Sequence, residues 1–216
     1  HLLGVWGADA AAVLETALGQ RPHGFNASLS IGSCLVCQAD DVGEAFELVV
    51  ADSALADVRT ALAAQVQEAP EAAWQQNELR RGIIRTTAAL SGKHVPQVLN
   101  YDLAGLLDFK KGCYIGQEVV ARLHYKGKSK RRCAVYALPS DAGQPQAGDG
   151  LVAADDGRTL GSVLRTIAVD GAETMVIGLV TADDSDQPLT LAGAGTSTLM
   201  QPVALPYTLR GSSAAS

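Results

Sequence analysis

Hydrophobic and polar positions along the first 82 residues predict alternating strands and helices. Short apolar runs rich in β-branched residues favour strands, and Ala-rich runs with apolar residues three or four positions apart favour helices. Gly19 fits a helix end, Ser53 a helix start and Pro70 a break between elements. The predicted strands are residues 1–7, 28–39 and 45–52, and the predicted helices are residues 8–20, 54–66 and 71–82.

The order of these elements points to a known arrangement. The second and third strands are expected to pair as a hairpin around residues 40–43. Strand, helix, strand, strand and helix in succession resemble most of a split βαβ, or ferredoxin-like, unit. The first part of the chain is therefore expected to be a ferredoxin-like α/β domain.

The hydrophobic pattern changes in the second half of the chain. Residues 86–109 are mostly loop, with Gly and Pro as punctuation. After Cys133, short β-rich runs alternate with Gly and Asp turns, which is typical of an antiparallel barrel or sandwich. The predicted fold class is α+β, with a ferredoxin-like domain at 1–130, a β-barrel at 131–210 and a flexible tail at 211–216.

Charge is distributed unevenly on an acidic chain. The net charge is −6, but residues 110–132 hold 8 of the 17 Lys and Arg and only one acid, Glu118. That window is +7, and the remainder, with 9 basic and 22 acidic residues, is −13. Such separation favours an anionic partner, although a charged edge that prevents sheet aggregation would look similar.

Cysteine usage and hydropathy bound the compartment. The four cysteines are too few and too scattered for a typical secreted disulfide scaffold, so we expect a reducing compartment: the cytoplasm if the source is bacterial, or the mitochondrial matrix if it is eukaryotic. No apolar run approaches the roughly 20 residues of a membrane span, so no membrane partner is expected.

Cys34 and Cys37 form a C-x-x-C, but a strand would point them to opposite faces. The histidines have no metal-binding spacing, and no metal site is predicted.

The stretch from Lys110 to Glu118, KKGCYIGQE, concentrates the candidate chemistry. Gly112 allows a tight turn, Cys113 and Tyr114 follow, and Val119-Val120-Ala121 could start a helix. A thiol near a helix N-terminus and beside two lysines is stabilised as the thiolate. A structural loop cysteine remains the alternative on the residues alone.

The string K-G-C-Y-I-G-Q-E followed by V-V-A-R resembles the signature of the YgfZ-type folate-binding proteins, relatives of the glycine-cleavage T-protein. The resemblance extends to Val95-Pro96-Gln97, to the basic run ending at Arg132 and to Leu205-Pro206-Tyr207. It implies a T-protein-like fold, and the chain looks as if it lacks roughly the first third of such a protein. It also implies a role in iron–sulfur cluster biogenesis and tRNA modification.

The resemblance implies the following site residues. Cys113 would be the functional thiol and Lys111 its thiolate partner, and Trp74 would stack on the pterin of tetrahydrofolate or another reduced folate, unless it is a core anchor. Where T-proteins carry an acid that binds the pterin, this chain has Arg80, a donor that could instead meet the folate glutamate tail. Further ligand-binding or loop-shaping residues would be Tyr114, Gln117 and Glu118. A basic hairpin would attract polyglutamyl folate or RNA through Lys126, Lys128, Lys130, Arg131 and Arg132.

The predicted function is a folate-binding protein that supports iron–sulfur cluster biogenesis or repair and thereby tRNA methylthiolation. Its partners would be folate, iron–sulfur assembly proteins or client enzymes, and tRNA is a further candidate. Two alternatives stay open. One is a folate-dependent aminomethyl or one-carbon transferase, for which no acid–base motif is visible. The other is a non-catalytic RNA-binding scaffold, so whether the protein turns over a substrate is undecided.

Overall fold

The computed structural model describes residues 1–139, 141–168, 173–193 and 199–209. Contacts divide the chain into two compact units, His1–Trp74 and Gln75–Ser216. The sequence placed the boundary near Arg131 instead. The units divide earlier because the segment from Gln75 to α4 packs with the β-rich part of the chain, as the contacts below show.

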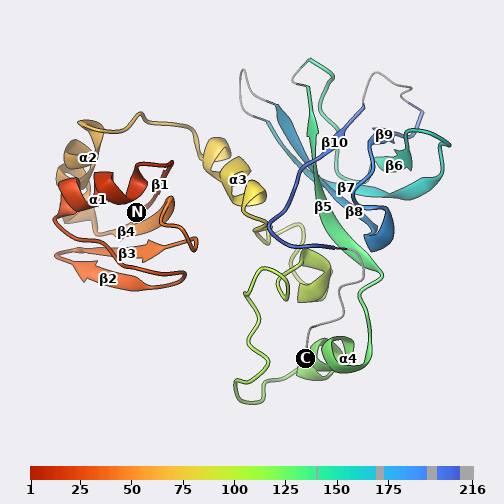
Figure 1. Cartoon of the computed structure of the whole chain (residues 1–216), viewed down its shortest axis with the longest axis horizontal. Coiled ribbons are helices and arrows are strands. Elements are labelled where there is room, and N and C mark those ends of the chain that lie inside the picture. Colours follow the sequence, from red (N-terminus) through yellow and green to blue (C-terminus); the bar gives the residue numbers. More distant parts are fainter. Residues whose placement is uncertain (140, 169–172, 194–198, 210–216) are drawn as a thin grey trace. The chain divides into compact units, whose positions relative to one another are not determined.

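The first unit is a four-stranded antiparallel sheet covered on one face by two helices (Figure 1). Its core contains Leu14, Val36, Phe46, Leu48 and Leu62, contributed by both helices and by the sheet. The elements are β1 (Leu2–Trp6), α1 (Ala10–Leu18), β2 (Ser28–Ile31), β3 (Cys34–Gln38), β4 (Ala45–Val50), the 3₁₀ turn η1 (Asp52–Ala54) and α2 (Leu55–Ala63).

The predicted hairpin is confirmed between β3 and β4, in the register Cys34↔Val50 to Gln38↔Phe46. The run 28–39, expected as one strand, is two strands, because the chain reverses at Gly32, whose φ of +57° suits glycine. The sheet order β1-β4-β3-β2 places β4 between β1 and β3, as in a split βαβ unit, with β2 as an added edge strand.

The second unit is a curled antiparallel sheet of six strands preceded by helical and irregular segments (Figure 1). The order is β10-β5-β8-β7-β6-β9. The elements are α3 (Glu71–Arg80), which begins in the first unit, η2 (Pro96–Leu99), α4 (Gln117–Lys126), β5 (Arg131–Leu138), β6 (Gly150–Ala153), β7 (Thr159–Ile167), β8 (Thr174–Thr181), η3 (Ala182–Asp184), β9 (Leu189–Leu191) and β10 (Gln201–Pro202).

The two outer strands of this sheet meet, which makes it a barrel. Leu189 of β9 and Met200 exchange two backbone hydrogen bonds of 3.1 and 2.8 Å, and Gln201, next in the chain, pairs with Ala137 of β5. Tyr136, Leu138, Leu151, Val176 and Met200 fill the interior. The antiparallel barrel expected after Cys133 is therefore confirmed, while the predicted tail at 211–216 lies outside the described residues.

Helix α3 belongs with the barrel through a buried glutamine. Gln76 is 8% exposed, and its side-chain amide donates to the carbonyl oxygens of Ile167 (3.1 Å) and Glu173 (2.8 Å) at the β7–β8 end. Glu78, on the same helix, is 3% exposed and forms a bidentate pair with Arg85. Both side chains are buried with partners, as buried polar groups need to be.

Candidate functional site

The loop that precedes α4 is shaped by backbone contacts of its own. Gly116 has φ +86°, a left-handed conformation that glycine adopts without strain, and it delivers the chain into α4. The backbone N–H of Tyr114 donates to the side-chain oxygen of Gln117 over 3.4 Å, and Lys110 N–H donates to Asp108 over 2.7 Å. Gln117 thus contributes to the shape of the loop.

The loop turns its reactive side chains outward. Cys113 is exposed, and its neighbours Tyr114 and Ile115 are 44% and 103% exposed. The ammonium of Lys111 lies 5.1 Å from the centre of the Tyr114 ring, a cation–π contact. Glu118 is exposed in the first turn of α4, where the helix dipole favours a carboxylate.

The other three cysteines occupy different environments. Cys34 and Cys37 alternate on β3, with Cys34 buried and Cys37 half-buried, so the strand interpretation of the C-x-x-C is confirmed. Cys133 is fully buried in β5, and this burial raises the pKa of its thiol to about 12. Among the four cysteines, all within the described residues, Cys113 alone is exposed.

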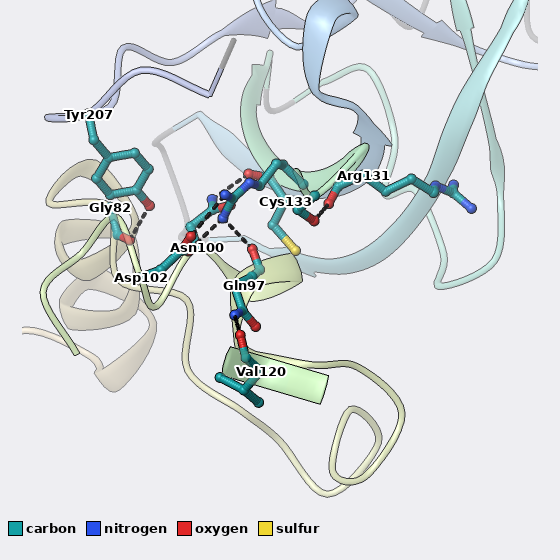
Figure 2. Close-up of polar contacts among 10 residues, drawn as sticks. Gly82, Gln97, Asn100, Asp102, Val120, Arg131, Cys133 and Tyr207 are labelled. Carbon is teal, nitrogen blue, oxygen red and sulfur yellow. Dashed lines mark hydrogen bonds and ion pairs between the residues drawn. The ribbon is translucent and has the colours of Figure 1, made fainter. Parts of the chain in front are cut away.

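A buried glutamine ties α4 to the barrel (Figure 2). The side-chain amide of Gln97 donates to the carbonyl oxygen of Val120 in α4 over 2.7 Å. The Gln97 backbone carbonyl accepts from the guanidinium of Arg132 at the start of β5. Gln97 is 1% exposed, so this link between helix and barrel is shielded from water.

The guanidinium of Arg132 is itself held by a carboxylate. Arg132 is 2% exposed and forms a bidentate pair with Asp102, at 2.6 and 2.9 Å. The anion-binding role predicted for Arg132 is therefore corrected, since a buried, paired guanidinium cannot recruit an external anion. Asp102 was missed in the sequence, where one acid in a loop gives no sign of a partner 30 residues away.

The same region holds the end of the described chain (Figure 2). Asn100, fully buried with φ +64°, donates from its side-chain amide to the carbonyl oxygen of Cys133 over 2.6 Å. The hydroxyl of Tyr207 donates to the carbonyl oxygen of Gly82, where a Cβ would lie 2.5 Å from the Tyr207 ring. Burial raises the Tyr207 pKa to about 12. These contacts anchor the segment that carries the loop.

The remaining predicted cations lie on the surface, but they form no hairpin. Lys126 ends α4, Lys128 and Lys130 lie in the connection that follows, and Arg131 begins β5. All four are exposed, and Arg131 also donates to the carbonyl oxygen of Leu179 over 3.1 Å. The expected basic hairpin is thus a helix-to-strand connection.

The two residues predicted to contact folate differ in access. Trp74 is 9% exposed, and its indole lies edge-on to Trp6 with ring centres 5.5 Å apart. A Cβ at Gly4 would lie 2.5 Å from the indole Cε3, so the ring lies directly on β1. This packing favours the core-anchor alternative. Arg80 is about half exposed, with Glu173 3.6 Å away.

These placements allow a partial test of the fit to folate. The glutamate tail needs exposed cations, and Arg80 and Lys111 supply them. The flat pterin needs an open aromatic or apolar surface, and the Trp74 indole is already covered by β1. Exposed cations that a glutamate tail could meet are therefore present, and Tyr114, at 44% exposure, is a more accessible aromatic side chain than Trp74.

A cavity of about 300 Å³ lies in the second unit, between β5, the segment after η3 and residues 202–209. Its lining includes Val135, Asp186, Leu205 and Tyr207. None of the site residues predicted from the sequence lines this cavity.

The described ranges of the chain contain neither a membrane-spanning helix nor a cluster of metal ligands. No helix there is long and apolar enough to cross a membrane. No three His, Cys, Asp or Glu side chains there gather as a metal ion would require.

Comparisons with known proteins agree with the signature. No family model matches the chain. Over 206 residues, 94% of this chain, the sequence is 29% identical to the tRNA-modifying protein YgfZ of Colwellia psychrerythraea. The chain spans 62% of the length of that relative. The resemblance to a YgfZ protein, first inferred from KGCYIGQE, is thereby confirmed.

A solved structure shares the fold. Aminomethyltransferase T of the glycine cleavage system from Bartonella henselae matches with a TM-score of 0.68 at 18% identity. The match covers 94% of this chain and 57% of that structure. The predicted α+β fold of T-protein type is confirmed.

Proposed function

We propose that this chain is the larger part of a YgfZ-type protein that binds a reduced folate and supports tRNA modification. The similarity to a tRNA-modifying protein over 94% of the chain supports the second half of this proposal. The T-protein-like fold is consistent with a folate ligand. The compartment that we propose is the cytoplasm of a bacterium.

Within that function we assign the chemistry to Cys113. The observation that carries this assignment is the contrast among the cysteines: Cys113 is exposed on a loop tied to a buried network, whereas Cys34 and Cys133 are buried. Water and partner molecules reach only an exposed thiol, and a thiol must be accessible to react or to ligate metal. The client would be an iron–sulfur enzyme of tRNA methylthiolation, and its assembly proteins would be partners.

The residues around the thiol have supporting roles. Lys111 holds Tyr114 through its cation–π contact and places positive charge on the loop. Gln117 fixes the loop backbone, and Glu118 is exposed beside it. When bound, a reduced folate would supply one-carbon chemistry, and Arg80, Lys111 and Tyr114 are the side chains we assign to its tail and ring.

The test is complementation in a bacterial strain that lacks its YgfZ protein. The full-length gene for this chain would carry Cys113→Ala, and methylthiolated tRNA would be measured by mass spectrometry. We expect methylthiolation to be lost at a normal level of soluble protein. Cys37→Ala is the matched control, because Cys37 is also partly accessible but lies on β3. Full rescue by the Cys113 variant would make this cysteine structural.

A further inference from the structure

The outer face of α4 carries an exposed surface that the proposed thiol chemistry does not use. Arg122 lies three residues after Val119, and Tyr125 and Lys126 lie three and four residues after Arg122, so the four side chains lie on one broad side of the helix. All four are exposed, with Val119 at 60% and Tyr125 at 68%. Val120, on another side, is buried and receives the Gln97 hydrogen bond. The helix is therefore anchored inward and presents this face to solvent.

Tyr125 is held in place by other aromatic rings. Its ring meets His124 edge-on, with centres 4.7 Å apart, and Phe109 edge-on at 6.4 Å. Phe109 and His124 are themselves stacked, 3.6 Å apart with 10° between their planes. Tyr125 thus stays largely exposed while its orientation is restrained, which lowers the entropy cost of stacking a ligand on it.

Exposed cations lie on the same helix as Tyr125 and in the connection that follows it. Arg122 and Lys126 lie on the same helix face, and Lys128 and Lys130 follow in the connection to β5. Within the part of the chain that the structure describes, none of these four side chains forms an ion pair. Their charge is not neutralised locally, although the chain outside 110–132 is −13. The positive field at α4 is therefore specific to this surface.

We propose that this face of α4 binds a single-stranded segment of RNA, with one base stacked on Tyr125 and the flanking phosphates held by Arg122, Lys126, Lys128 and Lys130. Proteins that bind single-stranded nucleic acids combine a basic surface with exposed aromatic rings. The rings stack on the bases, and the basic side chains pair with the negatively charged phosphates. Stacking and phosphate contacts read little sequence, so binding depends on single-strandedness rather than on a motif.

This inference rests on the proposed function for its choice of RNA over an acidic protein. It places the RNA on the helix that follows the Cys113 loop. The ten residues of α4 span about 15 Å, so an RNA lying along the helix would lie close to the signature loop.

Fluorescence anisotropy with a labelled 12-nucleotide single-stranded RNA of mixed sequence, titrated with the full-length protein, tests the proposal. Tyr125→Leu removes the stacking face but keeps bulk, and it should weaken binding about 5- to 150-fold. Tyr125→Phe should bind as the parent does. Lys128→Gln should reduce the slope of log affinity against log salt by about 0.7. Lys93→Gln, an exposed lysine elsewhere in the second unit, should change neither quantity. Circular dichroism would verify that each variant is folded.

Two results would overturn the proposal. One is no measurable binding of the RNA by the parent protein at low salt. The other is full affinity in Tyr125→Leu with weakened binding in Lys128→Gln, which would leave a simple anion site for a folate tail or an acidic protein. The outcome is separable from that of the proposed function. Cys113→Ala protein should bind the RNA as the parent does, whether or not it supports methylthiolation.

Discussion

At the scale of single residues, the predicted site residues divide into side chains that are exposed to solvent and side chains that are buried in contacts within the protein. Cys113, Tyr114 and Lys111 face solvent, whereas Arg132 and Trp74 are enclosed. Each enclosed residue stabilises the unit to which it belongs. Replacing them should therefore change the free energy of unfolding before it changes any chemistry.

The Arg132–Asp102 pair gives a sharp test of this division. Removing one partner leaves an uncompensated buried charge, so Arg132→Met or Asp102→Leu should each lower the free energy of unfolding by about 3–5 kcal/mol. The double variant should recover much of that loss. Urea denaturation measures all three. Arg59→Met, which removes the exposed Arg59–Glu68 pair, is the matched control and should cost less than about 1 kcal/mol.

A substitution of Trp74 distinguishes a role as core anchor from a role in folate binding. Because its indole lies on Gly4 and beside Trp6, Trp74→Ala should cost about 3–5 kcal/mol of stability. Far-UV circular dichroism in urea gives the stability, and calorimetry with tetrahydrofolate gives the affinity. Unchanged stability together with lost folate binding would contradict the anchor role and restore the pterin contact.

At the scale of elements, α4 depends on one buried contact from η2. Gln97 donates to Val120 in the middle of the helix, and its backbone accepts from Arg132 in β5. A ten-residue helix has little stability of its own in water, so tertiary contacts must hold it. The signature loop precedes this helix directly and should share its stability.

Gln97→Met tests this dependence while keeping the side-chain volume. Loss of the hydrogen bond to Val120 should raise the rate of hydrogen exchange in α4 several-fold, while β5 and β8 keep their protection, because local opening is cheaper than global unfolding. Mass spectrometry of peptides after exchange resolves the two regions. Gln67→Met, at an exposed position, is the control. Equal protection of α4 in both variants would show that other contacts hold the helix.

At the scale of the whole molecule, the barrel and the segments packed on it enclose several acidic groups whose pKa is raised by burial, among them Cys133, Tyr136 and Tyr207. Burial raises the pKa of Cys133 from 9.0 and of Tyr207 from 10.0, each to about 12. In the unfolded chain both groups ionise at their lower ordinary values. Each therefore contributes stability that is complete below about pH 9 and is lost as the pH rises toward 12.

These raised pKa values predict that the protein becomes less stable at alkaline pH. The free energy of unfolding should fall between about pH 9 and pH 12, and Cys133→Ala should fall less steeply over that range, even if its stability at pH 7 is lower. Urea denaturation at several pH values gives both curves. Parallel curves for the two proteins would mean that the Cys133 thiol does not contribute to the pH dependence.

The sequence by itself determined the elements and the signature. Periodicity located the helices ending near Gly19 and Arg80, the β3–β4 hairpin and the β-rich barrel, because these patterns reflect which faces are buried. The order of residues in KGCYIGQE identified the relative that the comparison then found. Local composition also located Cys113 in a loop before a helix, although the turn lies at Ile115 and Gly116 rather than at Gly112.

Only the tertiary structure decided which charged side chains are exposed to solvent and which are buried in ion pairs. Lys128 and Arg132 look alike in one basic run, yet one is exposed and the other pairs with Asp102, 30 residues away in the chain. Barrel closure at Leu189 and Met200, the chain reversal at Gly32 and the packing of Trp74 on Gly4 were likewise not predicted. Contacts between residues distant in sequence depend on how the elements pack. Hydrophobic periodicity shows which face of an element is buried, but not which other element covers that face.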